Sequence, residues 1–374
     1  MKRPFPLKPL KQSFPLLCLL AAGCGATAAN GGITRTYYVA ADEEVWDYAP
    51  SDSNLISGKK WEGFEPLVMI PAEGRVGRKY KKAVYHEYTD SSFTTRKPRP
   101  AEWEHLGILG PLLRAVVGDT IRVVFRNNGS YPYSMHPHGV FYNKDSEGSP
   151  YVDGTGGSDK GDDGVPPGGT HVYLWPVPER AGPAPGEISS VQWMYHSHTR
   201  EDADLNAGLI GPMLVTGRGK AKADGSPRGV DREFVVAFAE FDENTSWFLD
   251  ANLKAYAPDP SKRPRIGDFG DPGFLANLRE TMNGLSFGHL KGLTMKRGER
   301  VRWYLFGTTG FEVHAPHWHG NTVISNHMRT DVTNLMTMQM VTADMVPDNP
   351  GTWLFHCHVG PHLLAGMQAV YRVE

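Results

Sequence analysis

Alternating hydrophobic and polar residues along the chain predict short β-strands. Residues 120–125 read Thr-Ile-Arg-Val-Val-Phe and residues 300–305 read Arg-Val-Arg-Trp-Tyr-Leu. Successive side chains of a strand point to opposite faces, so this alternation is typical of strands with one buried face. No long stretch shows sustained helical periodicity, and 42 glycines and 29 prolines supply turns between the strands. The pattern therefore predicts an all-β protein built of sandwiches or barrels.

An internal repeat divides the chain into two halves. Each half contains a Gly-Asp/Glu strand start, a His-x-His-Gly motif, an aromatic strand ending in His-x-His, and an Ala-Gly-Leu/Met motif. The matching segments are residues 118–123 and 298–303, 136–139 and 317–320, 193–198 and 353–358, and 207–209 and 365–367. The repeat predicts two homologous β-domains, residues 31–217 and 231–374, joined by a polar linker at residues 218–230. The extra length of the first copy is a Gly/Asp/Pro-rich loop, residues 145–169.

The stretch Trp353–Met367 carries the most specific chemistry. If its aromatic start is a strand, His356 and His358 share one face and Cys357 points the other way. Cys357, His362 and Met367, with a second histidine from elsewhere, are the ligands of a blue-copper site, and His314 is the candidate for that histidine. The two remaining histidines are left for a second metal centre, one peptide unit from the thiolate.

Four His-x-His pairs supply eight further imidazoles. Strand alternation places both imidazoles of a pair on one face, and imidazole suits copper well, so the eight could hold three copper ions. A single pair is more often an ordinary surface feature, but four pairs in register around the Cys-x4-His-x4-Met set favour metal binding. The pairs are His136 and His138, His196 and His198, His317 and His319, and His356 and His358.

The first copy has lost the blue-copper ligands. In the alignment of the two halves, His314 corresponds to Tyr133, Cys357 to Ser197, His362 to Asp202, and Met367 to Leu209 or its neighbour. These residues do not replace a thiolate and two imidazoles, so the first domain is expected to hold no blue copper while it keeps both of its His-x-His pairs.

Charge and the first thirty residues bear on location and partners. The formal net charge of -2 argues against a nucleic-acid partner. Residues 1–30 combine a basic start with a short apolar run, which predicts an export signal and a periplasmic or secreted protein. Lipoprotein processing at Cys24 is the alternative. No later stretch is long enough to span a membrane.

With Cys18 and Cys24 in the signal, Cys357 has no disulfide partner, and metal ligation explains this lone thiol.

These motifs resemble those of the ceruloplasmin-like two-domain multicopper oxidases, relatives of small laccases, from about Tyr37 to Glu374. The resemblance implies two cupredoxin-like Greek-key β-sandwich domains in tandem, and four copper ions per chain equivalent. It places type 1 copper at His314, Cys357, His362 and Met367, and type 2 copper at His136 and His317. The type 3 pair would use the other six histidines, which are His138, His196, His198, His319, His356 and His358. It also implies a head-to-tail homotrimer with clusters shared between chains.

The implied activity is a laccase-like oxidase that reduces O2 to water with electrons from a phenol. Oxidation of Fe2+ or Cu+ is the alternative within the same class. Electrons would enter through the exposed edge of His362 or His314 and pass through Cys357 to His356 and His358. A copper nitrite reductase keeps a histidine on only one side of the type 1 cysteine, and both sides carry one here. A non-enzymatic copper carrier would be expected to have lost ligands, and none is missing.

Several other residues have two interpretations. Asp145 and Glu147 are candidate proton-relay carboxylates, as are Asp202 and Asp204, or they are solvated loop residues. Tyr142 matches a position where small laccases carry a redox-active tyrosine, or it is a core aromatic.

Three further motifs are also open. Met336, Met338 and Met340 would share one strand face, either as core filling or as a Cu(I)-binding patch. Asp162-Asp163 resembles a calcium-binding turn or is a solvated loop. Gly360-Pro361 stands before His362 where relatives often carry a polar or acidic residue, which could alter the hydrogen bonding that orients His362.

Overall fold

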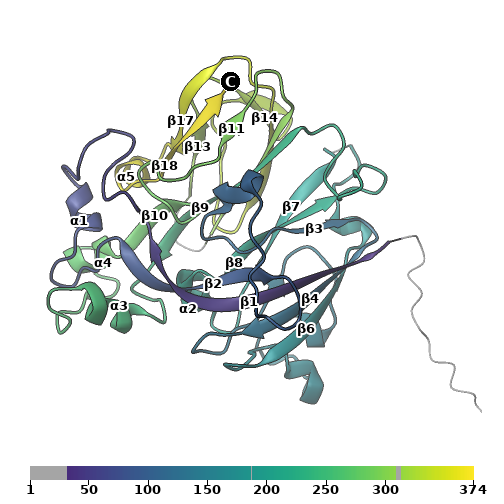
Figure 1. The fold of residues 1–374 in the computed structure, drawn as a ribbon, viewed down its shortest axis with the longest axis horizontal. Helices are drawn as coiled ribbons and strands as arrows, with labels where there is room; N and C mark the ends of the chain where they lie inside the picture. Colours follow the sequence, from purple (N-terminus) through teal and green to yellow (C-terminus); the bar gives the residue numbers. More distant parts are fainter. Residues whose placement is uncertain (1–31, 187, 309–312) are drawn as a thin grey trace, which may run out of the picture. The chain divides into compact units, whose positions relative to one another are not determined.

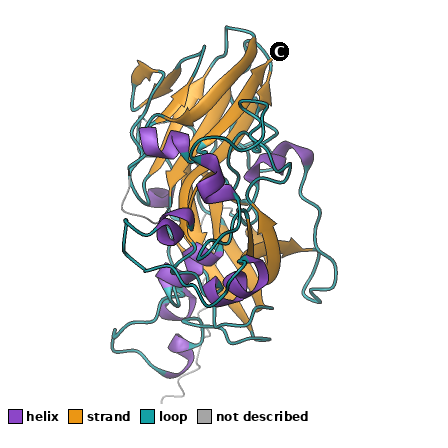
Figure 2. Ribbon diagram, turned by 90° about the vertical axis from the view of Figure 1, so that its left-hand side faces the viewer, coloured by secondary structure: helices purple, strands orange, loops and turns teal. Residues whose placement is uncertain are grey.

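The computed structural model describes residues 32–186, 188–308 and 313–374, and most of the regular structure in these residues is β-strand (Figure 1). Short helices and loops surround the strands (Figure 2). None of the helices in this part of the chain is long and apolar enough to cross a membrane. The export signal expected at residues 1–30, with Cys18 and Cys24, lies outside the described residues.

Two four-stranded sheets build the first domain. One has the order β2-β1-β4-β6, in which the long strand β1 pairs parallel with β4 and antiparallel with β2. The other has the order β3-β8-β7-β5. The strands are β1 (Thr34–Asp47), β2 (Lys79–Tyr88), β3 (Leu113–Val116), β4 (Thr120–Asn127), β5 (His136–Pro137), β6 (Thr170–Pro176), β7 (Ser190–His196) and β8 (Ile210–Thr216).

The second domain repeats this arrangement, as the internal repeat predicts. The order β10-β9-β12-β16 matches β2-β1-β4-β6 and continues into β14 and β15, and β11-β18-β17-β13 matches β3-β8-β7-β5. The protein therefore consists of tandem β-sandwich domains. The strands are β9 (Arg232–Asp242), β10 (Leu278–Met282), β11 (Thr294–Met295), β12 (Val301–Gly307), β13 (Pro316–Trp318), β14 (Val323–Ser325), β15 (Met328–Thr330), β16 (Met340–Met345), β17 (Gly351–Cys357) and β18 (Gln368–Val373).

Strands β9 and β12 are apolar on both faces because each face packs against a different hydrophobic cluster. Trp303 and Leu305 of β12 pack in the core of the second sandwich, whereas Tyr304 and Phe306 pack in a separate cluster. That cluster also contains Met194 and other residues of the first domain. Because successive side chains face opposite ways, one strand serves both the core of its own domain and the contact with the other domain.

The helices are short and lie between strands. The sequence signals that start a helix are clearest at α4. The Asp271 carboxylate caps this helix by accepting hydrogen bonds from Gly273 N and Phe274 N, and Pro272 is its first residue. The α-helices are α1 (Glu65–Met69), α2 (Glu201–Ala207), α3 (Leu249–Tyr256), α4 (Pro272–Ala276) and α5 (Gly360–Leu364), and the 3₁₀ helices are η1 (Ala101–Leu106), η2 (Lys144–Ser146), η3 (Gly157–Lys160) and η4 (Glu179–Ala181).

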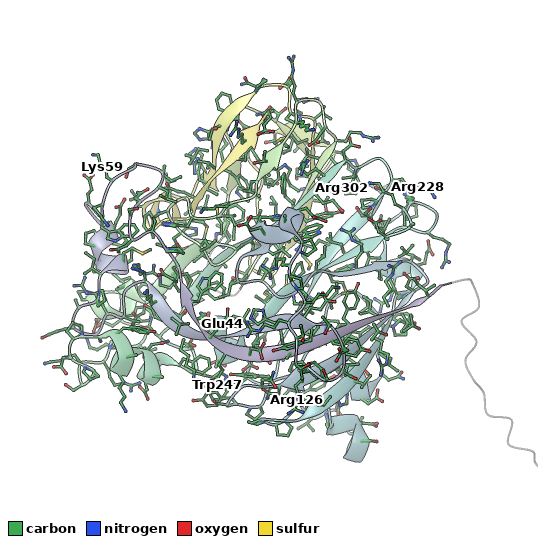
Figure 3. The ribbon with its side chains drawn as sticks, in the orientation of Figure 1. Glu44, Lys59, Arg126, Arg228, Trp247 and Arg302 are labelled. Carbon is green, nitrogen blue, oxygen red and sulfur yellow. The ribbon has the colours of Figure 1, made fainter. Side chains whose placement is uncertain are left out.

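Polar bonds also join the two domains. Arg302 of β12, which is labelled in Figure 3, donates to the hydroxyls of Ser189 and Ser190 at the start of β7, at 2.9 and 2.7 Å. A fully buried ion pair joins Lys82 of β2 to Glu243, which follows β9. Tyr48 donates to the same carboxylate at 2.5 Å, and Lys82 Nζ also donates to Asn206 O at 2.6 Å. Burial lowers the pKa of Lys82 and raises the pKa of Glu243.

Replacing Lys82 with Met should destabilise the protein by about 3–5 kcal/mol, because Glu243 is left buried without its cation. The double variant Lys82→Met/Glu243→Leu should recover most of this loss, because neither charge is then buried. Denaturant unfolding followed by tryptophan fluorescence measures both effects. A single variant as stable as the wild type would show that the pair does not hold the domains together.

Candidate metal centres

The strand register brings the histidine pairs together. His136 of β5 lies directly opposite His196 of β7, and in the second domain His317 of β13 lies directly opposite His356 of β17. The second histidine of each pair lies two residues further along on the same face. His356 and Cys357 lie in a β-strand, as the sequence predicts, and this strand, β17, ends at Cys357. Each domain therefore gathers four imidazoles at one end of one sheet.

In the first domain, the four rings contact one another. His138 Nε2 lies 3.1 Å from His196 Nε2, and the His136 ring lies 5.1 Å from the His198 ring, between centroids. His196 is buried, and the other three are partly buried. Burial lowers the pKa of His138 to about 4 and the pKa of His196 well below its usual value. Burial therefore favours the neutral form of His138 and His196, which is the form that binds metal.

The second-domain cluster is similar. His356 Nε2 lies 3.2 Å from His317 Nδ1 and 3.1 Å from His319 Nε2, so three ring nitrogens converge on one point. The ring of His358, which is exposed, lies 5.2 Å from that of His317. Burial lowers the pKa values of His317 and His356. Within the described residues, every ring contact among the eight histidines joins members of the same domain.

Hydrogen bonds to the far side of the rings show that these residues fit a metal. The Nδ1 atoms of His136, His196 and His356 lie 2.6, 3.1 and 2.8 Å from backbone carbonyl oxygens. A carbonyl only accepts, so Nδ1 carries the proton and Nε2 keeps its lone pair. Such fixed tautomers are typical of metal-ligating histidines.

The sulfur site lies on the other face of β17. Cys357 Sγ lies 3.4 Å from His362 Nδ1 and 4.0 Å from His314 Nδ1, and these two nitrogens are 3.1 Å apart. Met367 is fully buried, and its carbonyl accepts from Cys357 N at 3.1 Å. Ala315 N donates to Cys357 Sγ at 3.4 Å. A thiolate, two imidazoles and a thioether match a blue-copper donor set.

Two expectations about the surroundings of this site are wrong. His314 and His362 have little exposed edge, since they are only 4% and 2% exposed. The three alternating methionines also do not share a strand face. Strand β16 begins at Met340, and Met338 lies in a turn with φ +57°, where the amide of Gln339 donates to Met336 O. Met336 is exposed, whereas Met338 and Met340 pack against the cluster between the domains.

In the first domain, a hydrogen-bonded polar set occupies the position of the sulfur site. Tyr133 pairs with Val165 through both backbone bonds, as His314 does with Leu335. Ser197 N donates to Leu209 O, as Cys357 N does to Met367 O. Ser197 is thus the equivalent of the cysteine, and the buried Tyr133 that of His314.

The structure corrects the residue expected at the position of His362. Leu209 N donates to Asp204 O, as Met367 N does to His362 O, so Asp204 and not Asp202 takes the place of His362. The segment Ser197–Leu209 is two residues longer than Cys357–Met367, and helix α2 absorbs the difference. The buried Asp204 carboxylate accepts from Ser197 Oγ and from Trp247 Nε1, both at 2.7 Å. Trp247, which is labelled in Figure 3, comes from the second domain, and its ring stacks on that of Tyr131 with 4.3 Å between centroids.

The carboxylate and tyrosine candidates have different surroundings. Asp145 is exposed. Glu147 is nearly buried, where its carboxylate pairs with Lys144 at 2.5 Å and accepts from Tyr151 at 3.0 Å. Tyr142 is partly exposed, and its ring lies 5.8 Å from that of His136. Glu147 and Tyr142 therefore lie beside the first-domain cluster, and Asp202 is exposed on α2.

Two other carboxylates contact the histidine clusters and were not found from the sequence. Glu201 Oε2 lies 3.4 Å from His198 Nε2, and Asp331 Oδ2 lies 3.7 Å from His317 Nε2. The spacing of three residues between His198 and Glu201 could have indicated the first contact from the sequence, because the chain turns into helix α2 at Glu201. Asp331 is close only because its carbonyl accepts from Trp318 N, a long-range contact.

The calcium interpretation of Asp162-Asp163 stays a prediction. Asp162 is fully buried and accepts from Gly148 N at 2.6 Å, while Asp163 pairs with Lys160 at 3.3 Å. Among the described residues, the groups of metal-ligating side chains that converge within 4.8 Å are the sulfur site and the cluster of His317, His319 and His356.

Comparisons with known proteins agree with this geometry. The chain is 43% identical to the human protein named Ferroxidase HEPHL1 over 94% of its own length and 31% of the relative's. It is 40% identical to rat hephaestin over 98% of this chain and 32% of that protein, and 38% identical to human ceruloplasmin over 92% and 33%. The chain thus spans about a third of the length of these relatives.

Solved structures share the fold. A multicopper oxidase and a blue copper oxidase from Nitrosomonas europaea match with TM-scores of 0.57 and 0.56, at 20% and 16% identity. Each match covers 91% of this chain, and 89% and 86% of the other chains. Two multicopper oxidase profiles match residues 88–220 and 258–374, more than half of the sequence. The chain therefore belongs to the multicopper oxidase family.

Proposed function

We propose that this protein couples one-electron oxidation of a small reductant to the four-electron reduction of O2 to water. The observation that carries the proposal is the placement of Cys357. Its sulfur lies beside two buried imidazoles, and its peptide neighbours His356 and His358 belong to the second-domain histidine cluster. A covalent path of one residue therefore joins a thiolate site to paired imidazoles.

We assign each set of donor residues to one of the copper types named above. His314, Cys357, His362 and Met367 would hold type 1 copper, and His136 and His317 type 2 copper. When bound, copper supplies one-electron redox chemistry at the sulfur site and O2 reduction at the cluster. The type 3 ligands would be His138, His196, His198, His319, His356 and His358.

The chain itself orients these groups and limits access of water. Backbone carbonyls fix the tautomers of His136, His196 and His356, so the Nε2 atoms face inward. Burial of Cys357 and Met367 excludes water from the sulfur. Reduction of O2 to two waters consumes four protons. The Glu201 and Asp331 carboxylates lie 3.4 and 3.7 Å from cluster histidines, and Glu147 contacts His136 through its backbone carbonyl. Their Oε and Oδ atoms are the proposed proton carriers.

We propose that neighbouring copies of the chain assemble so that their histidine clusters form shared copper centres. Each domain supplies four of the eight imidazoles, and both clusters reach the surface of this chain through His198 and His358. A first-domain cluster can then be completed by the second-domain cluster of a neighbouring copy. Closed head-to-tail contacts of this kind form a ring, and a homotrimer is the ring that the family resemblance implies.

An organic reductant, such as a phenol, is the first candidate substrate. Val313, beside His314, and Pro361 and Leu364, beside His362, are exposed, and none of them carries a charge. Such surroundings favour an apolar ring over a hydrated cation.

Metal-ion oxidation is the second candidate, because a relative at 43% identity is named a ferroxidase.

The location that we propose is outside the cytoplasm, in the periplasm or the medium. It is supported by the basic and apolar composition of residues 1–30.

Copper-loaded protein should be blue and should consume O2 when a dimethoxyphenol is added. An oxygen electrode, with the phenol, Fe2+ and Cu+ supplied separately to one preparation, measures the preference between the two substrate classes. Nitrite reduction without O2 consumption, or a colourless copper-loaded protein, would contradict the proposed function.

A further inference from the structure

The loop that lengthens the first domain lies against its histidine cluster. Two of its residues contact the far side of two histidine rings. Glu147 O lies 2.6 Å from His136 Nδ1, and Ser149 Oγ lies 3.1 Å from His198 Nδ1. His136 and His198 come from different strands, β5 and the end of β7. The short segment Glu147–Ser149, here called the clamp, therefore spans both halves of the cluster.

The middle of the clamp is fixed in place. Gly148 N donates to Asp162 Oδ2, and Gly148 O accepts from Ser134 Oγ, both at 2.6 Å. Gly148 has φ +71°, and a Cβ at this position would lie 2.4 Å from Met135 O. Because Gly148 has no side chain, the backbone of the clamp can closely approach Met135, the residue before His136. Asp162 is fully buried, so this bond is shielded from water.

Ser134 connects the clamp to the histidines a second time. Its hydroxyl accepts from His198 N at 3.0 Å while it donates to Gly148 O. Its own amide donates to Ser197 Oγ at 3.0 Å. The backbone of His198 and the backbone of the clamp are thus joined through one buried hydroxyl, and their relative position is fixed.

The second domain orients its cluster differently. There, His317 Nε2 faces the exposed Asp331 at 3.7 Å, and His358 N donates to Ala315 O at 2.8 Å. The loop at residues 145–169 is the extra length of the first copy. The clamp contacts therefore come from sequence that distinguishes the first domain from its repeat.

We propose that the clamp orients His136 and His198 for copper and fixes the tautomer of His136, with Ser149 as the positioning residue for His198. This inference rests on the proposed function, because it assigns these histidines to copper. Glu147 acts on His136 through its backbone carbonyl, which no substitution removes. Ser149 acts through its side chain, and a single substitution therefore isolates its part.

The test is copper retention by Ser149→Ala in the full copper-loaded protein. Without the hydroxyl, the His198 ring loses the contact that holds its orientation, so the copper that does not contribute to the blue colour should be released by a chelator at about 10–100-fold lower chelator concentration. The blue absorbance should be unchanged, because Cys357 lies in the other domain. Ser149→Thr keeps a hydroxyl and should restore retention. Ser158→Ala, at an exposed position of the same loop, is the matched control.

The outcomes separate this inference from the proposed function. A wild-type protein that binds no copper or is not blue would overturn the proposed function. A blue wild type with Ser149→Ala retaining its non-blue copper equally well would overturn the clamp alone. Parallel loss of blue and non-blue copper in Ser149→Ala would also overturn it, because a general folding defect and not His198 would then be the cause.

Discussion

Replacing Cys357 with Ser should remove the blue colour and reduce turnover to less than about 1% of wild type, because a hydroxyl does not replace a soft thiolate. The sulfur is fully buried and lies 3.4 Å from His362 Nδ1, so no neighbouring group can take its place without repacking. The histidine clusters lie outside the sulfur site and should keep much of their copper. Absorbance, copper analysis and O2 consumption measure the three effects.

The chain offers its own control for this variant. Ser197 occupies the equivalent backbone position in the first domain, as the shared bonds to Leu209 and Met367 show. Ser197→Ala should leave the colour unchanged, although it removes the hydrogen bond to Asp204. A Cys357→Ser variant that stays blue would show that the colour arises elsewhere.

Mixed chains should recover activity that neither parent has. A variant with His138→Ala and His196→Ala loses the first-domain cluster, and a variant with His319→Ala and His358→Ala loses the second-domain cluster. Each alone should be inactive towards O2. If clusters form between chains of a head-to-tail trimer, co-expression should restore about one third of the centres in each mixed trimer.

The stoichiometry follows from the geometry of the ring. In any mixed trimer, only one of the three contacts joins an intact first domain to an intact second domain. Differently tagged chains, purified in two steps, give mixed trimers whose O2 consumption can be compared with that of each parent. Complete absence of recovery in purified mixed trimers would contradict clusters shared between chains and favour clusters built within one chain.

Much of the architecture could be predicted because it depends on local patterns. The alternation at Arg300–Leu305 predicts strand β12, and the repeated motifs predict two sandwiches with the same strand order. The four His-x-His pairs predict their own grouping, because alternation in a strand fixes which residues share a face. The convergence of Cys357 with His314 could also be predicted from the donor types.

What the sequence did not predict depends on helix length, turns and long-range packing. Counting five residues from Ser197 gives Asp202, but two extra residues in α2 bring Asp204 inward. The alternation of methionines at 336–340 resembles a strand, yet a turn with a positive φ at Met338 interrupts it. Asp331 approaches His317 through tertiary pairing alone, and no spacing in the sequence indicates this contact.

The division of the eight imidazoles between two domains has a thermodynamic consequence. If the type 2 and type 3 copper ions bind where two copies meet, an isolated chain can offer these ions only half of the donors of the complete site. The free energy of metal uptake is then also free energy of subunit association, so copper availability and protein concentration act on one coupled equilibrium. Dilution would weaken metal retention, and metal supply would favour the closed ring.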